Sequence, residues 1–164
     1  MFSLSITLTR NDISPALTRL IRTARRPAPV LRAMGTVFKS ITEGNFNSAG
    51  ASYRPIPWKD KMDGSPSNLQ ASRQLSRSFH MSVGDKTVTV SNPMIYAAIH
   101  QFGGVIRPKN AKFLSFIGPG GARYFAKKVT IPPRPFFPVW QGKLTVAAEK
   151  MIAAAGQRAV LAQG

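Results

Sequence analysis

The chain has 164 residues, and 43% of them are hydrophobic, which suits one domain with a core of its own. It contains no cysteine, which excludes disulfides and thiolate metal sites, and no apolar run approaches the ~20 residues of a membrane-spanning helix. Lysine and arginine number 23 against 6 acidic residues, a formal net charge of +17. This excess predicts a negatively charged partner: nucleic acid, an acidic protein surface or an anionic membrane, with a merely well-solvated basic surface as the simpler alternative.

The N-terminal part predicts a strand followed by helices. Residues 2–8 alternate apolar and polar side chains, which favours a strand over a signal peptide. Apolar residues then recur at helical spacing over 13–24 and again over 30–41. Because Pro27 lies between these stretches, we expect two consecutive helices or one sharply kinked helix, with Gly44 as a stop.

Residues 44–72 predict a long irregular loop. The stretch is rich in glycine, serine, asparagine and proline and shows no periodicity, and loops of this length are often functional. Trp58 could anchor the loop to the core, or the loop could become ordered only against a neighbouring subunit. The candidate interface residues are Tyr53, Trp58, Lys59 and Lys61.

The central part predicts antiparallel strands around a short helix. Residues 75–83 and 87–90 form an expected hairpin with turn residues between them. Residues 95–102 predict a short helix, and residues 113–117 and 123–131 predict a second strand pair.

The last segment predicts a long helix. Trp140, Leu144, Ala148 and Ile152 share one helical face, while 157–164 is expected to fray. The whole chain, 1–164, is therefore predicted to be a single α+β domain. We expect a small antiparallel β-sheet with helices packed on one face, N-terminal helices, a long C-terminal helix and the irregular loop near 44–72.

The sequence offers little for catalysis. His80 and His100 have no second metal-type residue at helical spacing. Asp60 and Asp63 lie near each other only in the loop, beside lysines, and no nucleophile-elbow or phosphate-loop motif occurs. We therefore predict no enzyme, with no catalytic, cofactor-binding or metal-binding residues.

The basic residues form clusters interleaved with aromatic side chains, a pattern that can bind nucleic acid without sequence preference. It can equally match an acidic protein surface, and we favour that partner. The candidate contacts are Arg19, Arg22, Arg25, Arg26, Arg107, Lys109, Lys112, Lys127 and Lys128.

Two motifs point to a known family. Residues 96–104 read Tyr-Ala-Ala-Ile-His-Gln-Phe-Gly-Gly, and residues 131–137 read Ile-Pro-Pro-Arg-Pro-Phe-Phe. Together with a Leu-x-x-Ser segment at 75–78, they resemble the phage virion morphogenesis family, the tail-completion proteins of Mu-like phages. The loop before Leu75 departs from the family pattern. The motif residues assigned to assembly by this resemblance are Tyr96, His100, Gln101, Phe102, Gly103, Gly104, Arg134, Pro135 and Phe136.

The resemblance implies a structural protein of the phage neck, in the virion and, during assembly, in the host cytoplasm. Such a protein would form a ring, hexameric rather than dodecameric, that completes the tail and joins it to the head. Its partners would be its own copies, the tail tube protein and head–tail connector proteins, with non-specific contact to packaged DNA as an option. No cofactor, membrane or small-molecule substrate is implied. The alternatives are a sequence-independent DNA-binding protein and a head-proximal adaptor ring.

The motif residues also predict local structure. We expect Tyr96, Ile99, Phe102 and Phe136 to pack internally, and His100 and Gln101 to bridge backbone groups. The glycine pair permits a chain reversal where a side chain would clash. Part of the remainder, Arg134 above all, is expected at a subunit interface.

Overall fold

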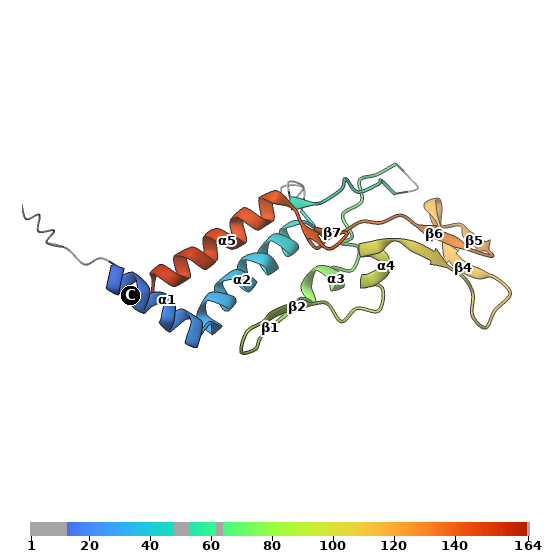
Figure 1. The fold of residues 1–164 in the computed structure, drawn as a ribbon. Helices are drawn as coiled ribbons and strands as arrows, with labels where there is room; N and C mark the ends of the chain where they lie inside the picture. The colour runs from blue at the N-terminus through green and yellow to red at the C-terminus, as the bar shows by residue number, and fades with distance from the viewer. Residues whose placement is uncertain (1–12, 48–52, 62–63, 164) are drawn as a thin grey trace, which may run out of the picture.

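The structure is a computed structural model that describes residues 13–47, 53–61 and 64–163 (Figure 1). The strand expected at 2–8 lies outside these ranges. The molecule is elongated, with the helices 13–25, 28–44 and 146–161 at one end and a narrow arm of strands at the other (Figure 1). The elements are α1 (Ile13–Arg25), α2 (Ala28–Gly44), α3 (Gln74–Arg77), β1 (His80–Val83), β2 (Val88–Ser91), α4 (Ala97–Phe102), β3 (Gly104–Ile106), β4 (Leu114–Ile117), the 3₁₀ turn η2 (Pro119–Gly121), β5 (Arg123–Ala126), β6 (Val129–Ile131), β7 (Val139–Trp140), β8 (Lys143–Leu144) and α5 (Val146–Leu161).

The two predicted N-terminal helices are confirmed. α1 ends at Arg25 and α2 begins at Ala28, because Pro27 lacks the amide hydrogen that a continuous helix needs at this position. α2 ends at Gly44, as the sequence predicts.

α2 and α5 lie side by side and bury a small core between them (Figure 1). Ile41, Ala148 and Ile152 form its centre. The helices approach closely at Gly156, where a Cβ atom would lie 3.1 Å from the sulfur of Met34. α5 continues through this glycine to Leu161, so residues 157–161 are helical.

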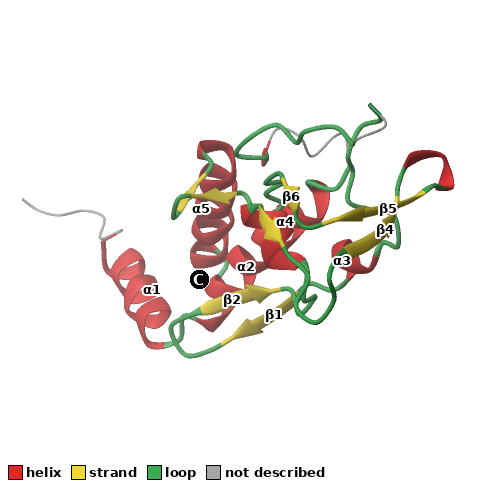
Figure 2. Ribbon diagram, turned by 90° about the vertical axis from the view of Figure 1, so that its right-hand side faces the viewer, coloured by secondary structure: helices red, strands yellow, loops and turns green. Residues whose placement is uncertain are grey.

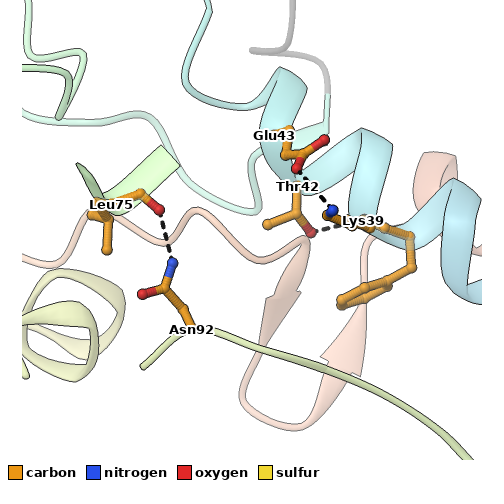
Figure 3. Close-up of polar contacts among 6 residues, drawn as sticks. Lys39, Thr42, Glu43, Leu75 and Asn92 are labelled. Atoms are coloured by element: carbon orange, nitrogen blue, oxygen red, sulfur yellow. Dashed lines mark hydrogen bonds and ion pairs between the residues drawn. The ribbon is translucent and has the colours of Figure 1, made fainter. Parts of the chain in front are cut away.

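The β1–β2 hairpin packs on α2. Its register pairs His80 with Ser91 and Val83 with Val88, and Gly35 of α2 lies so close that a Cβ there would be 2.4 Å from Val88. The strand predicted from residue 75 is wrong at its start, because Gln74–Arg77 form the short helix α3 that buries Leu75. Asn92 fixes the end of the hairpin to this helix by donating a 2.7 Å hydrogen bond to the Leu75 carbonyl (Figure 3).

The α+β class is confirmed, but the strands form two-stranded antiparallel ribbons instead of one continuous sheet (Figure 2). β4 pairs with β5, as predicted. The rest of the expected strand 123–131 is β6, which pairs with β3, an element that the sequence did not predict. β3–β6 therefore closes the base of the β4–β5 hairpin.

The C-terminal helix starts later than predicted. Trp140 and Leu144 lie in the β7–β8 hairpin, because Gln141 and Gly142 take positive φ angles of 50° and 77° and reverse the chain. Thr145 then caps α5, its hydroxyl accepting a hydrogen bond from the Ala148 amide. None of the described helices is long and apolar enough to cross a membrane.

The main core lies where the end of α2, the 53–61 segment, α3, α4 and residues 135–137 meet. The ring of Phe46 stacks on that of Phe136 with centroids 5.6 Å apart, and the ring of Phe79 contacts both. The buried members are Phe46, Trp58, Leu75, Phe79, Ala97 and Phe136.

Candidate functional site

The two sequence motifs meet in space at the end of α4, at a place that we call the motif junction (Gln101, Gly103, Arg134, Phe136 and Trp58). Gln101 is 4% exposed. Its side-chain oxygen accepts hydrogen bonds of 3.0 Å from the amides of Phe136 and Phe137, and its side-chain nitrogen donates to the Val139 carbonyl at 3.2 Å. The expectation that Gln101 bridges backbone groups is thus confirmed.

Gly103 makes close contact between the motifs possible. Its φ is 72° and its ψ −179°, a combination that favours glycine. A Cβ atom would lie 2.8 Å from the nitrogen of Pro133 and 3.0 Å from the carbonyl oxygen of Ile131. The predicted steric need for glycine therefore holds at Gly103, whereas a Cβ at Gly104 would meet only ordinary contacts.

Arg134 connects the second motif to the long loop. Its backbone amide donates to the His100 carbonyl at 2.7 Å, and its guanidinium donates to the carbonyls of Lys59 and Asp60 at 2.9 and 3.0 Å. Partial burial lowers the pKa of the Arg134 guanidinium, and the charge of Asp60 opposes this shift. The Arg134 guanidinium thus donates to backbone carbonyls of its own chain. The predicted role of Arg134 at a subunit interface stays a prediction.

Trp58 anchors the loop, the first of the two interpretations offered by the sequence. It is buried in the main core and its indole donates to the Pro135 carbonyl at 2.9 Å. The guanidinium of Arg54 lies 3.9 Å from the indole ring centre and donates to the carbonyl of Asn45. Of the other candidate loop residues, Tyr53 is half-buried against the α2–α5 core, and Lys59 and Lys61 are exposed.

His100 lines a shallow pocket of about 340 Å³ beside the junction, together with Lys61, Tyr96 and Arg134. Burial lowers the pKa of the His100 imidazole, and the nearby positive charge of Arg134 lowers it further. Folding therefore disfavours the protonated imidazole relative to the neutral one. Tyr96 contacts His100 edge to face, with ring centroids 6.0 Å apart.

Two predicted packing residues are not buried. Phe102 is 70% exposed and Tyr96 is 37% exposed. α4 buries Ala97 and Gln101, which share one face at a spacing of four residues, so Phe102 is rotated away from the core. Ile99 is half-buried, and Phe136 is buried as predicted, at 1% exposure. Pro135 is also buried.

The predicted basic residues lie at opposite ends of the molecule. Arg22, Arg25 and Arg26 line an open cleft beside Gln163, whose carbonyl accepts a hydrogen bond from Arg22. Arg19 is half-buried, and the others of that cluster, Arg22, Arg25 and Arg26, are exposed. The second group is exposed and lies in the arm, the segment 104–131 from β3 to β6. Its members are Arg107, Lys109, Lys112, Lys127 and Lys128. The fold thus does not join these groups into one continuous site.

The geometry of the junction is that of a structural connection. No group of three or more His, Asp or Glu side chains able to hold a metal ion occurs within 13–47, 53–61 and 64–163. Sequence reasoning missed Asn45, which is fully buried and donates to the Phe136 carbonyl at 2.9 Å. It also missed Arg54, because neither residue belongs to a motif or a periodic pattern.

Comparison with known proteins assigns this architecture to a class. Residues 8–160 match the model of the phage virion morphogenesis family. The Mu-like prophage FluMu G protein 2 of Haemophilus influenzae is 30% identical over 125 residues, covering 76% of this chain and 75% of that protein. No solved structure matches the chain significantly.

The chain belongs to the phage virion morphogenesis family, and the resemblance given by the two motifs is confirmed. It is a phage structural and morphogenesis protein.

Proposed function

We propose that the chain is a ring-forming subunit of the phage neck that terminates the tail and joins it to the head, and that it is not an enzyme. Family membership supports the general role in virion assembly. One structural observation supports the ring: α1 carries an apolar stripe that the single chain leaves uncovered. Leu17, Leu20 and Ile21 are 54%, 58% and 46% exposed.

The stripe has the spacing of an interface helix, because residues 17, 20 and 21 fall on one helical face. The same chain offers a different, complementary surface. An open groove of about 790 Å³ between α2 and α5 is lined mostly by small apolar side chains, including Ala33, Ala155 and Ala159. A contact between two different surfaces of identical chains is head-to-tail and closes into a ring when the rotation permits.

Charge makes this contact dependent on salt. Arg32 and Arg158 line the groove, while α1 carries Arg22 and Arg25 and is followed by Arg26. Salt screens the repulsion between these cations, so rings should form more readily at high ionic strength.

The test is the mass of the purified protein by light scattering at moderate and high salt, with electron microscopy of any discrete species. We expect a ring, with six subunits preferred over twelve, and its loss in a Leu17→Ser/Leu20→Ser variant. Ile117→Ser, which removes an exposed apolar residue of the arm, is the matched control and should leave the ring intact. A monomer at both salts, including in the presence of purified tail tubes, would contradict the proposal.

The net charge of +17 favours one second candidate, a sequence-independent DNA-binding protein. Binding of a random duplex that weakens steeply with salt would support it, because each neutralised phosphate releases counterions.

A further inference from the structure

The arm (residues 104–131, from β3 to β6) extends away from α1, α2 and α5 (Figure 1). Its outer part, the β4–β5 hairpin, pairs only within itself among the described strands. Its two edges are therefore unpaired within the described strands.

All charged side chains of the arm are basic. No Asp or Glu occurs between Lys86 and Ala148 in the sequence. The strand register brings separate stretches together: Ile106 pairs with Val129 and Leu114 with Ala126, which places residues 107–113 opposite residues 127–128 at the base of the hairpin. The exposed cations of the arm are Arg107, Lys109, Lys112, Arg123, Lys127 and Lys128.

Large apolar side chains accompany these cations. Ile117 is 71% exposed and Phe125 is 66% exposed. The rings of Phe116 and Tyr124 stack with their centroids 6.0 Å apart. Phe102, at the end of α4 just before the arm, is also exposed. The remaining exposed members are Val105, Ile106 and Phe113. A ribbon of this kind buries little of its own surface, and such patches mark interaction sites.

We propose that the arm is the docking surface for an acidic surface of a different protein of the phage particle. Exposed aromatic side chains such as Phe125 and Phe113 are enriched at protein interfaces. Acidic groups on the partner would neutralise the cations of the arm and guide the encounter. The choice of the particle as the source of the partner rests on the proposed neck function.

Two other occupants fit less well. A second copy of the chain has 6 acidic residues against 23 basic ones, so it would bring a like charge to the arm. Nucleic acid would neutralise the cations, but protein–DNA interfaces are more polar than protein–protein interfaces. The aliphatic side chains of Val105, Ile106 and Ile117 would gain little there.

A photocrosslinking amino acid at Phe125, in the full chain assembled into phage particles, identifies the occupant. We expect a crosslink to another virion protein, at a peptide rich in Asp and Glu. The same probe at Thr89, exposed on the β1–β2 hairpin, is the control and should not give this product. A crosslink from Phe125 to a second copy or to DNA, or no crosslink in particles that contain the chain, would overturn the proposal.

Reversing the charge of two arm residues tests docking of the arm separately from ring formation. Lys127→Glu/Lys128→Glu should form rings in solution like the wild type but enter particles about tenfold less. Lys143→Glu/Lys150→Glu, an equal change on exposed positions outside the arm, should enter normally. Normal entry of the arm variant would refute arm docking alone. Absence of the wild-type chain from particles would refute the neck function, and with it the particle as the source of the partner.

Discussion

A single buried amide, that of Gln101, makes three hydrogen bonds to a segment 35 and more residues away. The side chain thereby satisfies the buried amide of Phe136, the partly buried amide of Phe137 and the carbonyl of Val139. This explains why a polar residue occupies the buried face of α4.

Gln101→Leu keeps the volume and removes the hydrogen bonds. Because the amides of Phe136 and Phe137 would then be buried without an acceptor, we expect a loss of about 3 kcal/mol in the free energy of unfolding, measured by urea denaturation. Gln157→Leu on the exposed face of α5 is the control, with an expected change within about 0.5 kcal/mol. Equal stabilities for the two variants would contradict the role given to Gln101.

Two glycines with similar φ angles differ in the room that they leave for a side chain. Gly103 and Gly142 have φ angles of 72° and 77°, but a Cβ atom meets the Pro133 backbone at the first and nothing within 4 Å at the second. Gly142→Ala should therefore cost about 1 kcal/mol for the backbone conformation alone, and Gly103→Ala several times more. Thermal unfolding of both variants measures the difference, and a similar loss in both would exclude a steric role for Gly103.

His100 should make stability depend on pH. Its pKa in the folded protein lies below the ordinary value of 6.5, so the unfolded chain takes up the proton first as the pH falls. The contribution of His100 to the free energy of unfolding is complete above pH 6.5. It is lost as the pH falls through the pKa of His100 in the folded protein. Arg134 and Lys61 line the same pocket as the imidazole, and the positive charge of Arg134 opposes its protonation. Asp60 interacts with Arg134.

The measurement compares urea unfolding of the wild type and His100→Gln at about pH 7.5 and about pH 5. We expect the wild type to lose more stability on acidification than the variant. His80→Gln, on the exposed β1 strand, controls for the other titrating groups. A larger loss in the His100 variant would reverse the assigned direction.

At the level of elements, the sequence predicted those helices and turns that depend on residues close together in the chain. Helical periodicity and Pro27 gave α1 and α2, and the Gly84–Asp85 turn gave the β1–β2 hairpin. β3–β6 was missed because its partners are far apart in sequence, and no periodic pattern marks Gly104–Ile106. Trp140 and Leu144 joined the predicted helix because spacing alone does not detect a turn, although Gly142 and the capping Thr145 were available signals.

The candidate site was predicted in part. Residue types showed that Gln101 could bridge backbone groups and that Gly103 had a steric role. They did not show that the bridge spans both motifs, because its partners are backbone amides, which carry no residue-type signal. Burial of Phe102 was predicted from its apolar character, whereas the fold turned Gln101 inward in its place.

α2 depends on a glycine for its contact with the hairpin. Alanine at Gly35 should gain about 1 kcal/mol of helix propensity but lose more by displacing Val88 and Met81, whose atoms lie 2.4 and 2.8 Å from the new Cβ. We expect a net loss of stability by thermal unfolding. Gly156→Ala should be close to neutral, because the flexible Met34 side chain can move away.

For the whole molecule, the charge of +17 opposes compactness. Raising NaCl from about 20 mM to about 300 mM shortens the screening length and should raise the melting temperature of the monomer. Scanning fluorimetry at low protein concentration, with a sucrose series as a control for non-ionic effects, measures this. A melting temperature that falls with salt would show that favourable ion pairs outweigh the repulsion.

The pairing of β3 with β6 has a consequence for how this protein can diversify. Because Ile106 and Val129 are held side by side, residues 107–128 leave and re-enter the body at neighbouring points. Residues 107–128 thus form an exchangeable insert. Its length, its charge and the apolar residues at its tip can change without disturbing the motif junction or the helices. A related phage could acquire a new partner by exchanging this one insert, and a chimera carrying a foreign insert should keep the fold while changing its docking specificity.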